Sequence, residues 1–388
     1  MPLYNFDKII PRENTESVKY DAREEVFGRN DVLPMWVADM DFETPAFIRE
    51  AVIKRAQHPV YGYSVLSDDY FEAITNWADV RHQWKINREW ISFSPGIVPA
   101  INFAVLSYTR QGDGVIVQPP VYFPFFEAIK SNNRKQLNNK LVNENGRYRI
   151  DFDDLEEKAK SAKLLLLSHP HNPVGRSWTP DELKTIGEIC VRHNVVIVSD
   201  EIHNDLILPG FKHRPLAAVS EEIAGITVTC LAPSKTFNMA GLSTSSVIIS
   251  NDDLRKRFRK TLERLHIFRG NFFGYTASTA GYRHGAQWVD ALMAYVQGNF
   301  ELLSGFLEKE LPVIRLTPPE ATYLAWLDFR ATGLSDKEVK NKLVFEAGLG
   351  LSPGAVFGPG GKGFQRMNLA APRSVVADAC NRLKRTFH

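Results

Sequence analysis

The sequence of 388 residues has few cysteines, almost no excess of charge and no long hydrophobic run. Its three cysteines (Cys190, Cys230 and Cys380) are odd in number and far apart, which excludes a disulfide framework and a zinc-binding spacing. The net charge is only +2, so electrostatics gives no reason to expect nucleic acid or an anionic membrane as a partner. No apolar run is long enough to span a membrane, and the N-terminus lacks the apolar core of a signal peptide. We therefore expect a cytoplasmic protein with reduced cysteines.

The composition, with 44% hydrophobic and 24% charged residues, is that of a globular protein. The middle of the chain alternates short runs of Val, Ile and Leu with amphipathic helical patterns. This alternation is typical of an α/β domain whose parallel sheet is buried on both faces. Thr179, Pro180 and Glu182 carry a capping-box signature, which predicts that a helix begins there. The predicted strands are the runs 114–118, 163–168, 195–199, 226–231 and 246–250.

The two ends of the chain differ from this middle part. A single core stops growing at about 250–300 residues, so the length favours two domains. Residues 1–45 hold many charges and few regular patterns, whereas long helical patterns appear from about residue 286 onward. We expect residues 46–285 to form a large domain. The segments 1–45 and 286–388 are expected to form a smaller one together.

Several residues that could carry chemistry follow the predicted strands. Ligands of open α/β sheets bind at the carboxyl ends of the strands. Asp200 comes directly after one strand, Lys235 follows another by a short turn, and Asn172 and Tyr122 lie in proline-containing turns after two more. Gly96 precedes a predicted helix, whose free amide groups can bind phosphate. Each of these residue types alone is more often structural, so only their combination indicates a binding site.

Together these residue types fit pyridoxal 5′-phosphate (PLP). Its aldehyde needs a lysine that has lost part of its hydration, because desolvation lowers the amine pKa and makes the amine nucleophilic. Its ring nitrogen needs an acid that keeps it protonated, so that the ring accepts electrons. The ring needs an aromatic stacking partner and the phosphate needs a helix N-terminus. One short strand per group would bring all of them to one edge of the sheet.

The order of these motifs resembles fold type I pyridoxal-phosphate enzymes, the aspartate aminotransferase superfamily, over nearly the full chain. The matching pieces are NPVG at 172–175, Asp200 with His203, and Ser234 with Lys235. The spacing is also similar, with Asp200 28 residues after Asn172 and Lys235 35 residues after Asp200. The resemblance implies a mostly parallel seven-stranded sheet between helices. It also implies a smaller α+β domain formed by both chain ends.

By this resemblance five residues surround the cofactor ring. Lys235 is the Schiff-base lysine, Asp200 pairs with the ring nitrogen, and Tyr122 stacks on the ring. Asn172 binds the ring oxygen, and His203 lies close to it. The residues implied to hold the phosphate are Gly96, Ile97, Val98 and Ser234.

The same resemblance implies substrate and subunit contacts. Arg366 binds the substrate carboxylate through its guanidinium, a geometry suited to bidentate hydrogen bonding. The backbone of Val37 approaches the same carboxylate, and Asn172 also contacts the substrate. Tyr63 reaches the phosphate of the neighbouring subunit, which implies a homodimer with shared active sites.

Two further sequence segments resemble one branch of this family in particular. MWVADMDF at 35–42 and APSKTFNMAG at 232–241 are similar to the cystathionine β-lyase, or C–S lyase, branch. Many aminotransferases carry a phosphate-binding arginine eight residues after the lysine, whereas this chain has Ser243 there. The resemblance implies β-elimination in sulfur amino acid metabolism, releasing homocysteine from cystathionine or thiols from cysteine S-conjugates, with pyruvate and ammonia. An amino acid aminotransferase and a regulatory binding protein that keeps the fold stay open as alternatives.

Three other patterns are discounted. His169 and His171 with Asp200 and His203 would need a further ligand to form a hydrolytic metal site, and the PLP interpretation explains more residues, so no metal is expected. The Gly-rich stretch 358–363 lacks the residues that a phosphate-binding P-loop requires. The basic run 255–260 alternates with apolar residues as the solvated face of an amphipathic helix.

Overall fold

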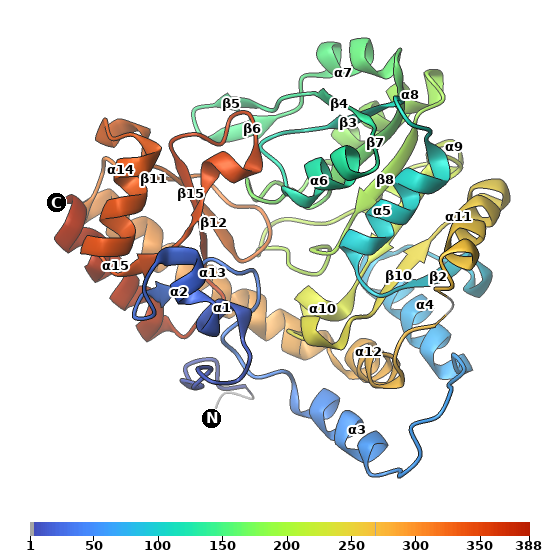
Figure 1. The fold of residues 1–388 in the computed structure, drawn as a ribbon, viewed down its shortest axis with the longest axis horizontal. Coiled ribbons are helices and arrows are strands. Elements are labelled where there is room, and N and C mark those ends of the chain that lie inside the picture. Colours follow the sequence, from blue (N-terminus) through green and yellow to red (C-terminus); the bar gives the residue numbers. More distant parts are fainter. Residues whose placement is uncertain (1–3, 268) are drawn as a thin grey trace.

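The computed structural model describes residues 4–267 and 269–388 and is built around a seven-stranded sheet (Figure 1). The strand order is β2-β10-β9-β8-β7-β3-β4. β10 is antiparallel to both of its neighbours, and every other pair in this sheet is parallel. This arrangement confirms the predicted α/β fold. The strands are β2 (Ile91–Ser94), β3 (Gly114–Val117), β4 (Lys135–Asn138), β7 (Ala162–Ser168), β8 (Val196–Asp200), β9 (Thr227–Leu231) and β10 (Ser245–Ile248).

The central strands are apolar on both faces of the sheet. In β7, Leu164 and Leu166 join one hydrophobic cluster while Leu165 and Leu167 join another, and all four are buried. Successive side chains of a strand point to opposite faces, so an unbroken leucine run fits a strand that is covered twice. All five predicted runs are strands. β2 (ISFS) and the edge strand β4 (KQLN) escape prediction because they contain too many polar residues to form an apolar run.

Helices cover both faces of this sheet. The residues of α5, α6 and α11 share one hydrophobic cluster with the sheet, and those of α7 and α8 share another. α11 buries Leu254, Phe258 and Leu262 and leaves its basic residues outside, as the sequence predicts. The bounds are α5 (Ile97–Tyr108), α6 (Pro124–Ser131), α7 (Phe152–Ala159), α8 (Pro180–Arg192) and α11 (Asp252–Arg264).

The capping box predicted at the start of α8 is present. The Glu182 backbone amide donates to the Thr179 hydroxyl at 3.2 Å, and the Thr179 amide donates to the Glu182 carboxylate at 2.8 Å. These two bonds satisfy amide groups that have no partner within the helix. They fix the point at which the chain leaves the loop after β7, which carries Asn172.

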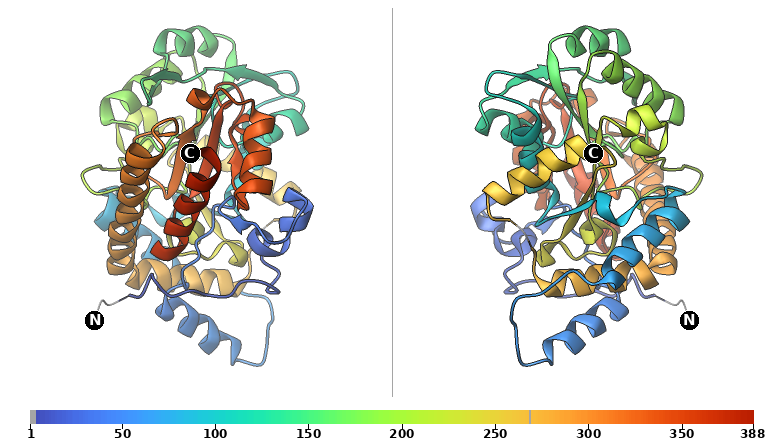
Figure 2. Two further views of the ribbon diagram at one scale, coloured as in Figure 1. Left: turned by 90° about the vertical axis from the view of Figure 1, so that its left-hand side faces the viewer. Right: turned by 90° about the vertical axis from the view of Figure 1, so that its right-hand side faces the viewer.

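Both ends of the chain lie together beside the large sheet. In Figure 1 the N-terminal helices α1 (Val18–Asp21) and α2 (Arg23–Phe27), in blue, lie next to the C-terminal elements, in red. β1 (Leu33–Pro34) pairs in parallel with β13 (Leu349–Gly350), which joins the two ends directly. The C-terminal part holds a four-stranded antiparallel sheet and three helices, with α13 and α15 side by side in Figure 2. Its elements are α13 (Ala286–Glu310), β11 (Arg315–Leu316), β12 (Leu324–Asp328), α14 (Asp336–Asn341), β14 (Ser352–Pro353), β15 (Phe364–Asn368) and α15 (Arg373–Phe387).

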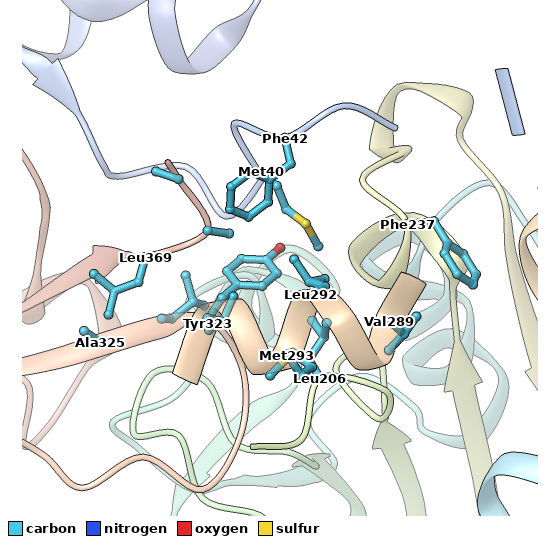
Figure 3. Close-up of a cluster of buried hydrophobic side chains, with 14 of the residues drawn as sticks. Met40, Phe42, Leu206, Phe237, Val289, Leu292, Met293, Tyr323, Ala325 and Leu369 are labelled. Atoms are coloured by element: carbon cyan, nitrogen blue, oxygen red, sulfur yellow. The ribbon is translucent and has the colours of Figure 1, made fainter. Parts of the chain in front are cut away.

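A large hydrophobic cluster connects these chain ends to the site-bearing part of the molecule (Figure 3). Met40 and Phe42 of the N-terminal segment lie close to Tyr323, which precedes β12, and to Leu292 of α13. Phe237, two residues after Lys235, is fully buried in the same cluster. The position of the Lys235 segment is therefore coupled to the packing of both chain ends.

Among the remaining helices, α3, α4 and α12 lie in the lower part of the molecule in Figure 1. α3 packs on α12, and α12 packs on α4. A loop without regular structure joins α3 to α4. None of the described helices is both long and apolar enough to cross a membrane. The bounds are α3 (Ala46–Ala56), α4 (Asp68–His82), α9 (Glu221–Ala224), α10 (Pro233–Thr236) and α12 (Phe272–His284), with a separate hairpin of β5 (Val142–Glu144) and β6 (Arg147–Arg149).

The core predicts a mutational effect that can be measured. Leu292 is fully buried in the large cluster, so Leu292→Ala should lower the free energy of unfolding by about 2–5 kcal/mol through lost burial and an unfilled cavity. Leu106→Ala is the matched control, because Leu106 lies on α5 with 41% of its side chain exposed, and its loss should stay below about 1 kcal/mol. Urea unfolding followed by circular dichroism measures both. Equal losses for the two variants would contradict the packing described here.

Candidate active site

The candidate site lies where the strands of the large sheet end. β3, β7, β8 and β9 are mutually parallel, so their carboxyl ends meet at one edge. β2 ends at the same edge and β10 begins there, because β10 is antiparallel to both β2 and β9. Residues that are far apart in the sequence are therefore brought together. Ser168 at the end of β7 lies opposite Asp200 of β8, which lies opposite Cys230 of β9.

This edge opens into a cavity of about 820 Å³. All but one of the residues predicted from the sequence line it. The exception is Tyr63, which lies in the exposed loop between α3 and α4. The predicted residues in the cavity wall are Val37, Gly96, Ile97, Val98, Tyr122, Asn172, Asp200, His203, Ser234, Lys235 and Arg366.

Burial is the main cause of the shifted pKa values of Lys235 and Asp200. Lys235 lies in α10, and its Nζ donates a hydrogen bond to the carbonyl oxygen of Ala38. Desolvation lowers the pKa of Lys235 to about 8, although the nearby Asp39 acts in the opposite direction. Asp200 is 4% exposed, and burial raises its pKa to about 7. Near neutral pH, each group exchanges a proton more readily than an exposed lysine or aspartate would.

Arg366 projects into the cavity from β15 and is held by the chain around it. Its Nη1 donates to Asn172 Oδ1 at 3.1 Å, and its Nη2 donates to the carbonyl oxygen of Trp36 at 2.9 Å. The guanidinium carbon lies 4.9 Å from the centre of the Phe357 ring. Burial lowers the pKa of Arg366 to about 10, so the group stays cationic at neutral pH. The buried Nε has no partner among the described residues, which leaves a donor for an anionic ligand.

The N-terminal segment that carries Val37 crosses the site and is tied down on both sides. Asn368 Nδ2 donates to the Val37 carbonyl oxygen at 2.7 Å, and the Tyr323 hydroxyl donates to the Ala38 carbonyl oxygen at 2.9 Å. Neither Asn368 nor Tyr323 was predicted. Tyr323 lies in an apolar run with no local signal, whereas Asn368 could have been suspected because it is two residues from Arg366 and so lies on the same face of β15.

Amide and hydroxyl groups form another part of the cavity wall. Gly96 is the N-cap of α5, and Ile97 and Val98 are its first residues, where amide groups lack helical partners. Ser243, at the position where many aminotransferases have arginine, lines the cavity itself. Thr244, which was not predicted, also lines it. Its hydroxyl is buried without a hydrogen-bond partner in the described part of the chain.

A buried acid behind Lys235 anchors the lysine segment. Asp205 accepts hydrogen bonds from the Thr236 hydroxyl at 2.8 Å and from Trp77 Nε1 at 3.0 Å, and His82 Nε2 lies 2.9 Å from it. These contacts hold the residue after Lys235 against α4. No sequence pattern singles out Asp205, since its partners come from two distant segments, α4 and α10.

The histidine pair 169 and 171 has structural contacts. His169 Nε2 lies 2.9 Å from the Arg214 carbonyl oxygen, and His171 Nε2 lies 2.9 Å from the Pro120 carbonyl oxygen. Neither ring lines the cavity. Across residues 4–267 and 269–388 no three His, Cys, Asp or Glu side chains are grouped so that they could hold a metal ion.

The cavity fits the cofactor predicted from the sequence. Three of its buried polar atoms, His203 Nδ1, Thr244 Oγ1 and Arg366 Nε, lack partners within the described residues. Buried polar groups are nearly always hydrogen-bonded, so these atoms indicate a polar ligand. A lysine with a lowered pKa, a buried acid and the free amides of a helix start are the groups that an aldehyde, a ring nitrogen and a phosphate require.

The raised pKa of Asp200 makes stability depend on pH in the protein freed of ligand. The folded state keeps the proton up to about pH 7, whereas an unfolded aspartate loses it near pH 4, so stability falls as the pH rises through this window. Asp200→Asn cannot lose a proton. Relative to the parent it should gain stability between pH 4 and pH 8, by up to roughly 4 kcal/mol.

Melting temperatures at pH 4.5 and pH 8 measure this effect, with Asp253→Asn as the control. Asp253 is exposed at the start of α11, so its substitution should produce no comparable dependence on pH. A melting-temperature difference between Asp200→Asn and the parent that is the same at both pH values would show that Asp200 is not protonated at neutral pH.

Comparisons with known proteins agree with this geometry. Residues 30–383 match the family of class I and II aminotransferases. Cystathionine beta-lyase PatB of Bacillus subtilis (strain 168) is 46% identical over 98% of this chain and 99% of its own. A PLP-bound protein of Clostridium difficile 630 has a TM-score of 0.98 at 43% identity, covering 99% and 100% of the two chains. The PLP-bound C-S lyase of Staphylococcus hominis has a TM-score of 0.93 at 34% identity, covering 99% and 98%. The family predicted from the sequence is therefore confirmed, and the chain belongs to the class I and II aminotransferases.

Proposed function

We propose that this protein is a PLP-dependent carbon–sulfur β-lyase that cleaves an amino acid thioether such as cystathionine or a cysteine S-conjugate. The observation that carries the proposal is the similarity to a cystathionine beta-lyase over almost the whole chain. The cavity supports it, because Lys235, Asp200 and Arg366 line one space at the sheet edge. The predicted cofactor is borne out by the PLP-bound relatives of 43% and 34% identity.

The residues of the cavity divide into groups that would hold the parts of PLP. Lys235 would bind the aldehyde, Asp200 the ring nitrogen, and Tyr122 one face of the ring. Asn172 and His203 would bind the ring oxygen. The residues proposed for the phosphate are Gly96, Ile97, Val98 and Ser234, and the unpaired hydroxyl of Thr244 adds a donor to them.

The residues of the chain then position and deprotonate the substrate. When bound, PLP supplies an electron-accepting ring that stabilises negative charge at the substrate Cα. Arg366 and the Val37 backbone bind the carboxylate, which orients the Cα–H bond toward Lys235. With a pKa of about 8, roughly a tenth of Lys235 is unprotonated at pH 7, far more than of an exposed lysine, so its Nζ can accept the Cα proton. The protonated Lys235 can also return this proton, so the same amine acts first as a base and then as an acid.

Loss of the Cα proton is followed by departure of the sulfur. The Cβ–S bond breaks, its electron pair leaves with the thiolate, and hydrolysis of the remaining three-carbon fragment gives pyruvate and ammonia. An aminotransferase shares the deprotonation but transfers the amino group to a 2-oxo acid. A difference of 1.36 kcal/mol between the barrier to sulfur departure and the barrier to amino transfer changes the ratio of their products about tenfold. Measuring the products therefore shows which of the two activities dominates.

The lyase proposal predicts the products of cystathionine. The purified protein with PLP should release pyruvate and ammonia in equal amounts, together with a thiol, without any added 2-oxo acid. Lys235→Ala should lose at least about 10³-fold in rate, because the other amine among the described lining residues, that of Lys340, is exposed and comes from α14 rather than from the sheet edge. Lys212→Ala is the control, since Lys212 is exposed and lies outside the cavity. A reaction that requires a 2-oxo acid and releases no thiol would identify an aminotransferase.

We also propose that the protein is a homodimer in which Tyr63 completes the phosphate site of the neighbouring subunit. Tyr63 is fully exposed, and Val60, Tyr61 and Val65 in the same loop are also more than half exposed. Apolar side chains gathered in an exposed loop are typical of a surface that another protein covers. A phenol hydroxyl at this position would add a donor to a phosphate site that has Ser243 in place of arginine.

Subunit mixing tests this arrangement. Lys235→Ala and Tyr63→Ala should each be nearly inactive alone, but a hybrid dimer contains one site with both residues intact. Random reassortment should therefore restore about a quarter of the parent activity. Sedimentation establishes the oligomeric state of each sample. A fully active monomer, or mixtures that recover no activity although hybrids form, would overturn the shared site.

We further propose the division into a large domain of residues 46–285 and a small domain of residues 1–45 and 286–388. The seven-stranded sheet falls within the first part, while the four-stranded sheet and the β1–β13 pair fall within the second. We also propose a cytoplasmic location. The three cysteines are buried and unpaired, which is consistent with a reducing compartment.

A further inference from the structure

The part of the cavity near Arg366 is walled by apolar side chains that the proposed mechanism does not use. Two series of contacts lead outward from Arg366. Its Nη2 binds the Trp36 carbonyl oxygen, and the Trp36 ring lies 5.7 Å from the ring of Phe27 in α2. Its guanidinium lies over Phe357, whose ring is 6.4 Å from the ring of Phe123. Apolar walls from α2 and from the loop before α6 therefore begin next to the group that binds the substrate carboxylate.

Three large apolar side chains in these walls are exposed although they line the cavity. Val26 is 39% exposed, Phe123 is 38% exposed and Val356 is 44% exposed. They come from three separate elements, namely α2, the loop before α6 and the turn after β14. Single exposed apolar residues need no explanation, but several that converge on one concave surface indicate an apolar ligand.

The charges that line the cavity do not suit a charged leaving group. Among the described lining residues the charged ones are Glu127, Asp200, Lys235, Lys340 and Arg366. Asp200, Lys235 and Arg366 already have roles, and Glu127 and Lys340 are exposed side chains. Ion pairs with exposed side chains contribute little to binding. The homocysteine part of cystathionine carries an ammonium and a carboxylate group, and both would lose hydration between apolar walls.

From these observations we propose that the preferred substrates are cysteine S-conjugates with an apolar group on sulfur, and that Val26, Phe123 and Val356 bind this group. The inference rests on the proposed lyase function and names its substrate class. The reaction is R–S–CH₂–CH(NH₃⁺)–COO⁻ + H₂O → R–SH + CH₃–CO–COO⁻ + NH₄⁺. The Cβ–S bond breaks with its electron pair on sulfur, the thiolate takes up a proton, and water supplies the keto oxygen of pyruvate.

The test compares thiol release from S-methyl-L-cysteine, S-benzyl-L-cysteine and L-cystathionine. We expect kcat/KM for S-benzyl-L-cysteine to exceed that for S-methyl-L-cysteine by on the order of 100-fold, because even one methylene that fills an apolar pocket is worth about 10–200-fold. It should exceed that for cystathionine by at least about tenfold. Val356→Asp and Phe123→Ala should each lower the benzyl-to-methyl ratio by about tenfold or more. Val80→Asp, at an exposed position of α4 outside the cavity, should leave the ratio unchanged.

Equilibrium binding provides a measurement that does not depend on turnover or on the acidity of the thiol. Calorimetric titration of the PLP-loaded Lys235→Ala protein should show tighter binding of S-benzyl-L-cysteine than of cystathionine. Val356→Asp in the same background should reverse or remove that preference. Faster cleavage and tighter binding of cystathionine would overturn the substrate inference and leave the lyase function standing. Absence of thiol release from all three thioethers would overturn the lyase function itself, and this inference with it.

Discussion

The common edge at which the strands of the large sheet end is the constraint on which the site depends. Four consecutive strand pairs of this sheet are parallel, so side chains that follow β7, β8 and β9 must meet there. The antiparallel β10 contributes from its start rather than its end, and this places Ser243 and Thr244 in the same cavity. A strand that shifted by one residue would turn its buried side chains to the opposite face.

Burial of ionisable groups at this edge is costly for folding and useful for chemistry. Desolvation acts on Lys235, Asp200 and Arg366 alike and in each case disfavours the charged form. The surrounding structure compensates with contacts that hold the segment above the site. Arg12 binds Asp39 at 2.6 Å, and the buried Lys19 binds Asp41 at 2.6 Å, on either side of Met40. The N-terminal segment is thus fixed by ion pairs as well as by the hydrophobic cluster of Figure 3.

Much of this arrangement could be predicted from the sequence, because the signals were local. The apolar strand runs, the capping box and the polar residues directly after each strand are patterns that each span only a few positions of the sequence. Asp205, Tyr323 and Thr244 could not be found in this way, because each acts through partners from distant segments or through a missing hydrogen bond. The edge strand β4 lacked a signal because its exposed polar side chains look like those of a loop. The apolar walls around Val26, Phe123 and Val356 depend on packing between three elements, which only the structure brings together.

The most direct test of the account locates PLP on the chain. The protein loaded with PLP is reduced with borohydride, which makes the bond between the cofactor aldehyde and a lysine permanent, and is then digested for mass spectrometry. The account predicts one modified peptide, the one that contains Lys235, both before a cysteine S-conjugate is added and after it has been consumed, because β-elimination leaves the cofactor aldehyde unchanged after each turnover. A stable label on a different lysine, or none on a protein that still releases thiol, would contradict the assignment of Lys235 and the site built around it.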